Sequence, residues 1–117
     1  MITAEAQVGA AGFLAALAAH GYAVARQNEF AIFSYPVEVG GRAGQQVKVG
    51  LQIPDDWPLS PPPGPHVSPR LGHPHGAVNP SPLGPDWEYW SRPAQSWAAE
   101  RSMRAYLRHL RTLFSQI

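Results

Sequence analysis

The sequence of 117 residues contains no cysteine. Disulfide bonds, thiolate metal sites and catalysis by a thiol are therefore excluded. Long apolar runs are missing as well, because no segment approaches the roughly 18 to 20 apolar residues that a membrane span needs. The apolar N-terminal stretch lacks the cationic start of a signal peptide and contains Glu5. We therefore expect a cytoplasmic protein with no membrane partner.

Lysine is nearly absent, since eight of the nine basic residues are arginine. The net charge of +1 gives no overall field that would draw the protein to nucleic acid, so we expect no nucleic-acid partner. Any basic surface must be local. An excess of arginine favours forked pairing with carboxylates, although GC-rich coding produces the same bias.

The first half of the chain predicts one helix followed by strands. Thr3 can cap a helix near residues 4–19 that Gly21 can end. Short runs rich in Val, Phe, Tyr and Ile then fill residues 22–53 and predict three antiparallel strands. Residues 65–69 are expected to add a short strand at a sheet edge, where the missing N–H of proline is tolerated. The helix would bury four apolar residues on one face: Val8, Phe13, Leu14 and Leu17.

The second half predicts a stiff loop and a second helix. Twelve of the thirteen prolines lie between Pro54 and Pro93, and proline helps a long irregular segment to hold one shape. The apolar residues near the C-terminus recur at helical spacing and predict a helix over residues 98–116 that starts near Ser96 and Glu100 and packs on the sheet. This pattern indicates an α+β fold in a single domain over residues 1–117.

The polar side of the second helix is unusually basic. We interpret it either as a solvated face or as a docking surface for an acidic partner. Four arginines form it: Arg101, Arg104, Arg108 and Arg111.

The order of these elements and two proline signatures resemble the ubiquitin-conjugating enzyme (UBC-like) family, most closely its divergent bacterial branches. Trp57-Pro58 stands where the family has Tyr-Pro, Pro61-Pro62 closes the same turn, and His73-Pro74-His75 is similar to the family's His-Pro-Asn signature. The resemblance implies an N-terminal helix, a four-stranded antiparallel meander, a long proline-rich loop and a C-terminal helix packed on the sheet.

The same resemblance implies partners and contact residues. A ubiquitin-like protein and its activating enzyme would be the partners, and no cofactor is implied. Trp57 and the four arginines are the candidate partner-binding residues. The oligomeric state is not predicted.

Two departures from the family bear on chemistry. The signature Asn is replaced by His75, and Leu83 stands near the position at which the catalytic Cys is expected. Leucine can neither attack a carbonyl nor act as a leaving group. The resemblance therefore implies a non-catalytic partner in a ubiquitin-like conjugation pathway, as cysteine-less variants of the family are. The alternative is an acyl carrier in which Ser81 forms an oxyester, with His73 or His75 as base or as support for the loop and the oxyanion.

Two further interpretations of the loop are open at this point. His66, His73 and His75 with Asp86 could hold zinc, although Pro74 restricts the backbone between two of them. For His73 the resemblance favours a buried turn residue that bonds to the backbone. The aromatic residues of the loop could stack on nucleic-acid bases, but we favour packing against the sheet. These aromatic residues are Trp87, Tyr89, Trp90 and Trp97.

Overall fold

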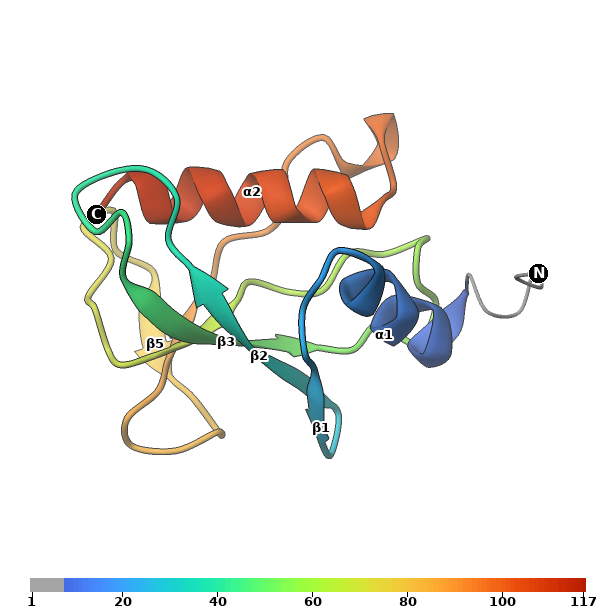
Figure 1. The fold of residues 1–117 in the computed structure, drawn as a ribbon, viewed down its shortest axis with the longest axis horizontal. Coiled ribbons are helices and arrows are strands. Elements are labelled where there is room, and N and C mark those ends of the chain that lie inside the picture. Colours follow the sequence, from blue (N-terminus) through green and yellow to red (C-terminus); the bar gives the residue numbers. More distant parts are fainter. Residues whose placement is uncertain (1–7) are drawn as a thin grey trace.

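The structure, a computed structural model, describes residues 8–117. Two helices accompany a six-stranded antiparallel sheet in the order β1-β2-β3-β4-β6-β5 (Figure 1). The helices are α1 (Gly9–Ala19) and α2 (Met103–Ser115), and the 3₁₀ helix η2 (Trp97–Ala99) precedes α2. The strands are β1 (Ala25–Gln27), β2 (Phe30–Pro36), β3 (Gln46–Gln52), β4 (His66–Ser68), β5 (Val78–Pro80) and β6 (Glu88–Trp90).

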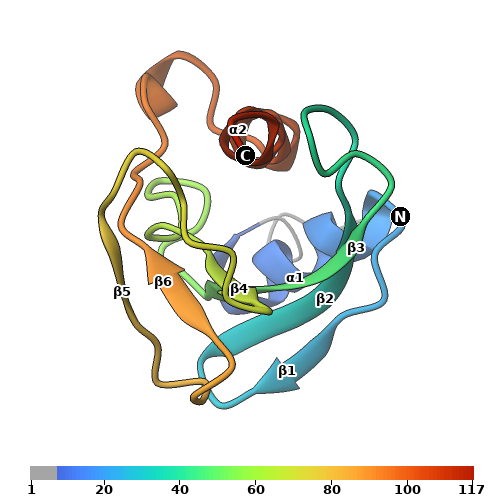
Figure 2. The ribbon, with the colours of Figure 1, turned by 90° about the vertical axis from the view of Figure 1, so that its left-hand side faces the viewer.

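The sheet curves around both helices, so one face is covered and the other is turned away from them (Figure 2). Successive side chains of a strand point to opposite faces of the sheet. The side chains of β2 and β3 therefore fall into two sets, one on each face. Paired residues such as Phe33 and Val49 face the helices and are buried. We call the opposite side the outer face. It carries Phe30, Ile32, Ser34, Lys48, Gly50, His66 and Tyr89.

The core lies between the helices and the sheet. Phe13 and Leu17 of α1 are fully buried, as predicted, whereas Val8 precedes the helix and is 52% exposed. Each large apolar side chain buried in this way contributes about 1.5–3 kcal/mol. From α2 the core takes Met103, Tyr106, Leu110, Leu113 and Phe114. The predicted cap Thr3 and residues 4–7 of the predicted helix lie outside the described residues.

The prediction of four strands was wrong, because the loop after β4 contributes β5 and β6. The three strands predicted over residues 22–53 are confirmed as β1, β2 and β3. The predicted strand within residues 65–69 is confirmed as β4, but it lies inside the sheet between β3 and β6 and not at an edge. Pro65 and Pro69 only flank its three residues, so every residue of β4 itself has an N–H.

The second helix begins later than predicted. Its N-cap is Ser102, whose hydroxyl accepts the N–H of Ala105 at 3.1 Å. Ser96 has a left-handed backbone and forms no side-chain cap. Trp97 of η2 donates its indole N–H to the carbonyl of Pro58 at 3.0 Å and packs on Trp57, and these contacts hold residues 97–99 away from the axis of α2.

Candidate functional site

Ser81 and His66 form the most direct pairing of a nucleophile and a base in the described chain. Ser81 directly follows β5, and His66 opens β4. The Ser81 hydroxyl oxygen lies 2.8 Å from Nδ1 of His66 and also accepts the N–H of Leu83 at 3.1 Å. In the tautomer that carries the ring proton on Nε2, Nδ1 accepts the hydroxyl proton of Ser81.

His66 is held in an aromatic sandwich on the outer face. The ring of Tyr89 stacks on the imidazole with 4.6 Å between the ring centroids. The ring of Phe30 is nearly perpendicular to the imidazole, with 4.9 Å between the centroids. The side chain is only 5% exposed, and this burial lowers the pKa of His66 to about 4. A neutral imidazole can take a proton from a hydroxyl, but the same burial opposes the imidazolium that would result. The pairing is therefore a weak base beside a serine.

Ser81 borders a hollow of about 400 Å³ between the β5–β6 hairpin and Arg70. Ser81 as a whole is half-buried. Trp87 forms part of the wall, while Asn79 and Pro80 lie at the rim.

Leu83, the residue in place of the expected Cys, packs down onto the outer face. Its Cδ1 lies 2.6 Å from the point where a Cβ of Gly50 would stand, and the ring of Trp87 lies 3.5 Å from the same point. A Cβ at Gly50 would make the end of the Leu83 side chain shift. The loop between β5 and β6 thus uses Leu83 as an apolar anchor on the sheet.

The two histidines of the His-Pro-His signature have different surroundings. His73 is buried, with Nε2 at 3.1 Å from the carbonyl of Leu113 in α2 and Nδ1 accepting the N–H of His75 at 3.2 Å. Burial is the main cause that lowers the pKa of His73. The ring is therefore neutral, with Nε2 as donor and Nδ1 as acceptor. It ties the loop to α2, and the base beside Ser81 is His66 in place of His73 or His75.

Glu88 is a buried carboxylate that the sequence analysis missed. One oxygen, Oε2, accepts N–H groups from Leu71 at 3.0 Å, Gly72 at 2.8 Å and the Trp90 indole at 2.7 Å. The side chain is 4% exposed, and no ion pair to it forms among residues 8–117. Glu88 therefore fixes the backbone directly before His73. The sequence signal that could have indicated this buried carboxylate is the position of Glu88 between Trp87 and Trp90.

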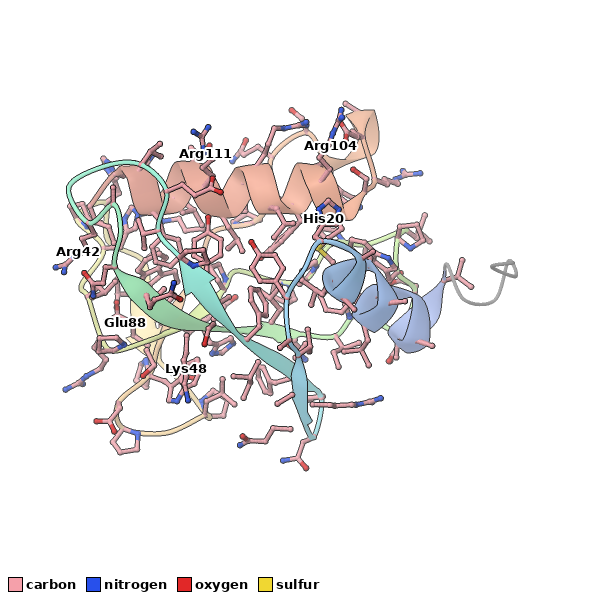
Figure 3. The ribbon with its side chains drawn as sticks, viewed as in Figure 1. His20, Arg42, Lys48, Glu88, Arg104 and Arg111 are labelled. Atoms are coloured by element: carbon pink, nitrogen blue, oxygen red, sulfur yellow. The ribbon has the colours of Figure 1, made fainter. Side chains whose placement is uncertain are left out.

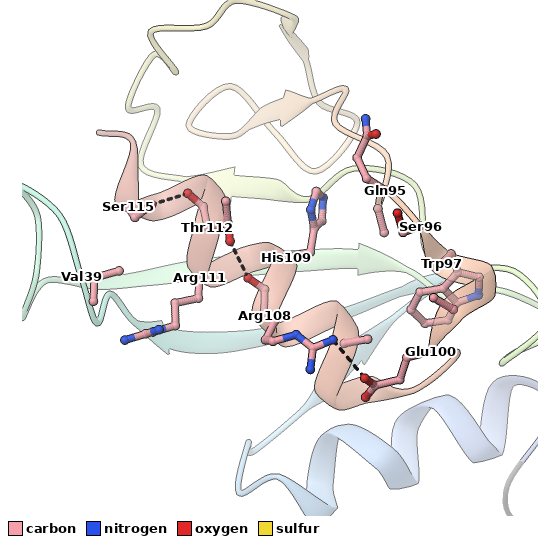
Figure 4. Close-up of a pocket in the computed structure, with 13 residues that line it drawn as sticks. Val39, Gln95, Ser96, Trp97, Glu100, Arg108, His109, Arg111, Thr112 and Ser115 are labelled. Atoms are coloured by element: carbon pink, nitrogen blue, oxygen red, sulfur yellow. Dashed lines mark hydrogen bonds and ion pairs between the residues drawn. The ribbon is translucent and has the colours of Figure 1, made fainter.

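The four arginines lie on the solvent side of α2 and just before it. Arg104 and Arg108 both pair with Glu100, at 3.4 and 3.0 Å, and Arg111 pairs with Glu38 at 2.9 Å. Arg101 precedes the first residue of the helix. The three paired side chains are still 73%, 58% and 54% exposed. Figure 4 shows Arg108 reaching to Glu100 beside a hollow of about 620 Å³ along α2.

Other predicted site residues are placed less favourably for binding. Trp57 is 3% exposed and packs against Phe13 and Trp97, so little of its surface can meet a partner. Trp90 is fully buried, in keeping with the packing role favoured above. Within the described residues no group of three His, Asp or Glu side chains is arranged to hold a metal. The zinc interpretation is therefore not carried further.

The fold is an α+β arrangement of two helices on one face of an open antiparallel sheet. A comparison of the chain with protein-family models, with curated proteins and with solved structures finds no match. None of the helices described here is both long and apolar enough to cross a membrane.

Proposed function

We propose that this chain is a cysteine-less UBC-like protein of a bacterial ubiquitin-like conjugation pathway. It acts in the cytoplasm as a non-catalytic partner that binds a ubiquitin-like protein, its activating enzyme, or both. The observation that carries the proposal is the contact between Leu83 and Gly50. Where the resembling family keeps a thiol, this chain has an apolar side chain that anchors the loop. The loop has a packing role that needs no reactive group.

Two further contacts support a loop built for shape. Glu88 holds the backbone directly before the signature segment through the N–H groups of residues 71 and 72, and His73, the first residue of the segment, bonds to α2. Buried hydrogen bonds of this kind fix a single conformation because leaving any of their groups unpaired is costly. A fixed loop presents a constant surface to a partner without taking part in chemistry.

The docking surface that we assign is the arginine side of α2. The four arginines carry four positive charges, and Glu38 and Glu100 carry two negative charges, so this side of α2 has an excess of two positive charges. The net charge of the whole chain is only +1. Charges of this kind at an interface rim steer association and select an acidic partner surface. The groove beside Arg108 and His109 gives such a partner a contour to fit.

Binding should be measured by calorimetry with the ubiquitin-like protein and the activating enzyme encoded in the same genome. Changing Arg104 and Arg108 together to Glu should weaken binding at least about tenfold, since it replaces attraction with repulsion. Arg26→Glu, on strand β1 away from α2, is the matched control and should bind as the unchanged protein does. Equal affinity of the unchanged protein, the double variant and Arg26→Glu would disprove the assigned docking surface. Absence of binding to either partner would disprove the proposed function.

A second function is favoured by one observation, the 2.8 Å contact between Ser81 and His66. In this acyl-carrier reading, the Ser81 oxygen attacks the thioester carbonyl of the loaded activating enzyme. The C–O ester bond forms, the C–S bond breaks, and the serine proton passes through Nδ1 of His66 to the departing thiolate. The weak basicity of His66 makes this the less favoured function.

The two functions separate on a gel. The protein is incubated with the activating enzyme, the ubiquitin-like protein and ATP, and the products are treated with thiol or with hydroxide. An adduct that resists thiol, yields to hydroxide and disappears in Ser81→Ala but not in Ser91→Ala would establish the carrier. Binding without any adduct would support the non-catalytic partner.

A further inference from the structure

Three polar side chains form a row across the outer face of the sheet. Ser34 of β2 pairs with Lys48 of β3, and Lys48 pairs in turn with Ser68 of β4. Side chains of directly paired residues stand about 4.5–5.5 Å apart at Cβ, so the two serines flank the base of the Lys48 side chain. In Figure 3, Lys48 lies on the side of the sheet away from Arg104 and Arg111 of α2. The row is therefore separate from the proposed docking surface.

The row lies in a hollow of about 590 Å³. Arg70, two residues beyond the end of β4, forms part of its wall, and so does Asp86 from the β5–β6 loop. Gln46 adds an amide at the same rim. The hollow thus gathers two cations, two hydroxyls and one amide around a space open to solvent, with a single carboxylate at its border.

The two cations of this hollow lack acidic partners within residues 8–117, unlike the arginines of α2. Arg104, Arg108 and Arg111 each have a carboxylate within 3.4 Å, whereas Lys48 and Arg70 form no ion pair there. Asp86 lines the same hollow without reaching either cation. An anion that enters would therefore meet charges that no other side chain already satisfies.

We propose that this hollow binds a phosphate group. Arg70 offers a planar fork of N–H donors that matches two phosphate oxygens, and Lys48 contributes a compact charge. The hydroxyls of Ser34 and Ser68 donate to the remaining oxygens from either side of Lys48. The tetrahedral anion, with several acceptor oxygens and more than one negative charge, uses all four groups at once, which a planar carboxylate cannot do equally well.

The phosphate can belong to free inorganic phosphate or to a nucleotide. The hollow beside Ser81 shares Arg70 with this one and contains the indole of Trp87. A nucleotide with its phosphate at Lys48 would have room there for its remaining parts. This inference does not depend on a role in conjugation.

Binding is tested by NMR titration of the full chain with inorganic phosphate and, separately, with AMP, at constant ionic strength set by chloride. We expect saturable shifts of the amides of Ser34, Lys48, Ser68 and Arg70. Tighter binding of AMP with added shifts at Trp87 identifies a nucleotide, and equal binding identifies free phosphate. Absence of saturation, an equal response to acetate, or shifts confined to α2 would each overturn the site.

Three variants sharpen the test because they move affinity in opposite directions. Lys48→Gln and Arg70→Gln should each weaken phosphate binding at least about tenfold, since each removes a charge-assisted contact. Asp86→Asn should strengthen it severalfold, because it neutralises the one carboxylate that lines the hollow among residues 8–117. Arg26→Gln, an exposed arginine elsewhere on the sheet, is the control and should leave affinity unchanged. Side chains at these positions are exposed, so the variants are expected to fold. Equal affinity for Lys48→Gln and the unchanged protein would disprove the assignment.

Discussion

The hydroxyl of Ser81 and the imidazole of His66 lie 2.8 Å apart on the outer face of the sheet, although 15 residues separate them in the chain. Strand pairing brings them together, because β6 lies between β4, which carries His66, and β5, which leads into Ser81. The same serine oxygen accepts the N–H of Leu83. One hydroxyl therefore both fixes the start of the hairpin loop and ties that loop to β4.

Removal of this hydroxyl should destabilise the fold. Ser81→Ala deprives Nδ1 of His66 and the N–H of Leu83 of their partner, and we expect a loss of about 1–2 kcal/mol in the free energy of unfolding. Urea denaturation measures it, with Ser91→Ala, in an exposed position, as the control that should change by less than about 0.5 kcal/mol. In a double-mutant cycle with His66→Phe, the coupling should be about 1 kcal/mol. A coupling near zero would show that the contact contributes nothing.

Acid should unfold the protein progressively. Burial lowers the pKa of His66 to about 4, and burial likewise lowers the pKa values of His73 and His109. In the unfolded chain His66 becomes protonated as the pH falls through about 6.5. In the folded protein the same side chain stays neutral until the pH nears 4. The stabilisation is therefore complete above pH 6.5 and is lost between about pH 6.5 and 4, on the order of 3 kcal/mol for His66.

Urea denaturation at a series of pH values checks this expectation. His66→Gln should flatten the dependence in that range, because glutamine does not titrate. His20→Gln removes an exposed histidine and should leave the slope as it is. A slope that His66→Gln leaves unchanged would assign the acid sensitivity to other groups.

Gly50 in β3 and Gly64, two residues before β4, should respond very differently to alanine. A Cβ at Gly64 would overlap the carbonyl of Trp90 and lie 2.6 Å from the backbone nitrogen of Arg92, and backbone cannot move aside cheaply. We expect Gly64→Ala to cost about 3 kcal/mol or more. A Cβ at Gly50 would stand too close only to the end of the Leu83 side chain, which can turn away, and would meet Trp87 and His66 at ordinary contact distances of 3.5 and 3.7 Å.

Gly50→Ala should therefore change stability by less than about 1 kcal/mol, and Leu83→Ala should remove even that penalty in the double variant. Thermal denaturation of the unchanged protein, Gly64→Ala, Gly50→Ala and the double variant of Gly50→Ala with Leu83→Ala gives the order of their stabilities. A severe loss in Gly50→Ala that persists with Leu83→Ala would mean that the loop does not rest on this glycine.

Local pattern predicted the parts of this fold whose residues alternate or repeat. The strands over residues 22–53 and the apolar side of α2 follow periods of about 2 and 3.6, and both are confirmed. Strand β5 was missed because its three residues are all exposed and end in proline. Strand β6 was missed because a buried Glu88 replaces the expected apolar residue.

The candidate site depends on contacts that no short window contains. His66 entered the sequence analysis only through the zinc alternative, and Ser81 was matched with His73 and His75, because pairing through β6 is invisible in the sequence. The start of α2 was misplaced for a similar reason: Trp97 is held by the carbonyl of Pro58, 39 residues away, so a serine before it could not become the cap. Tertiary contacts decided between two serines of equal capping propensity.

Glu88 should prove to be the residue on which the signature segment depends. Its Oε2 accepts three N–H groups, so Glu88→Ala leaves the buried indole N–H of Trp90 and two part-buried backbone N–H groups unpaired and should cost about 2–3 kcal/mol. Glu88→Gln keeps an acceptor oxygen but loses its charge, and should cost about 1–2 kcal/mol. The exposed Glu29→Gln is the matched control and should be neutral within about 0.5 kcal/mol.

Hydrogen exchange distinguishes a local role of Glu88 from a general loss of stability. In Glu88→Gln the backbone amides of Leu71 and Gly72 should exchange at least about tenfold faster. The exchange rates of amides in the centre of β3 should change only as far as the global stability of the protein changes. The reason is that these two N–H groups donate to the carboxylate and to no backbone carbonyl. Unchanged protection of both amides in Glu88→Gln would mean that the backbone before His73 is held by its own packing, and the carboxylate would then have no part in shaping the loop.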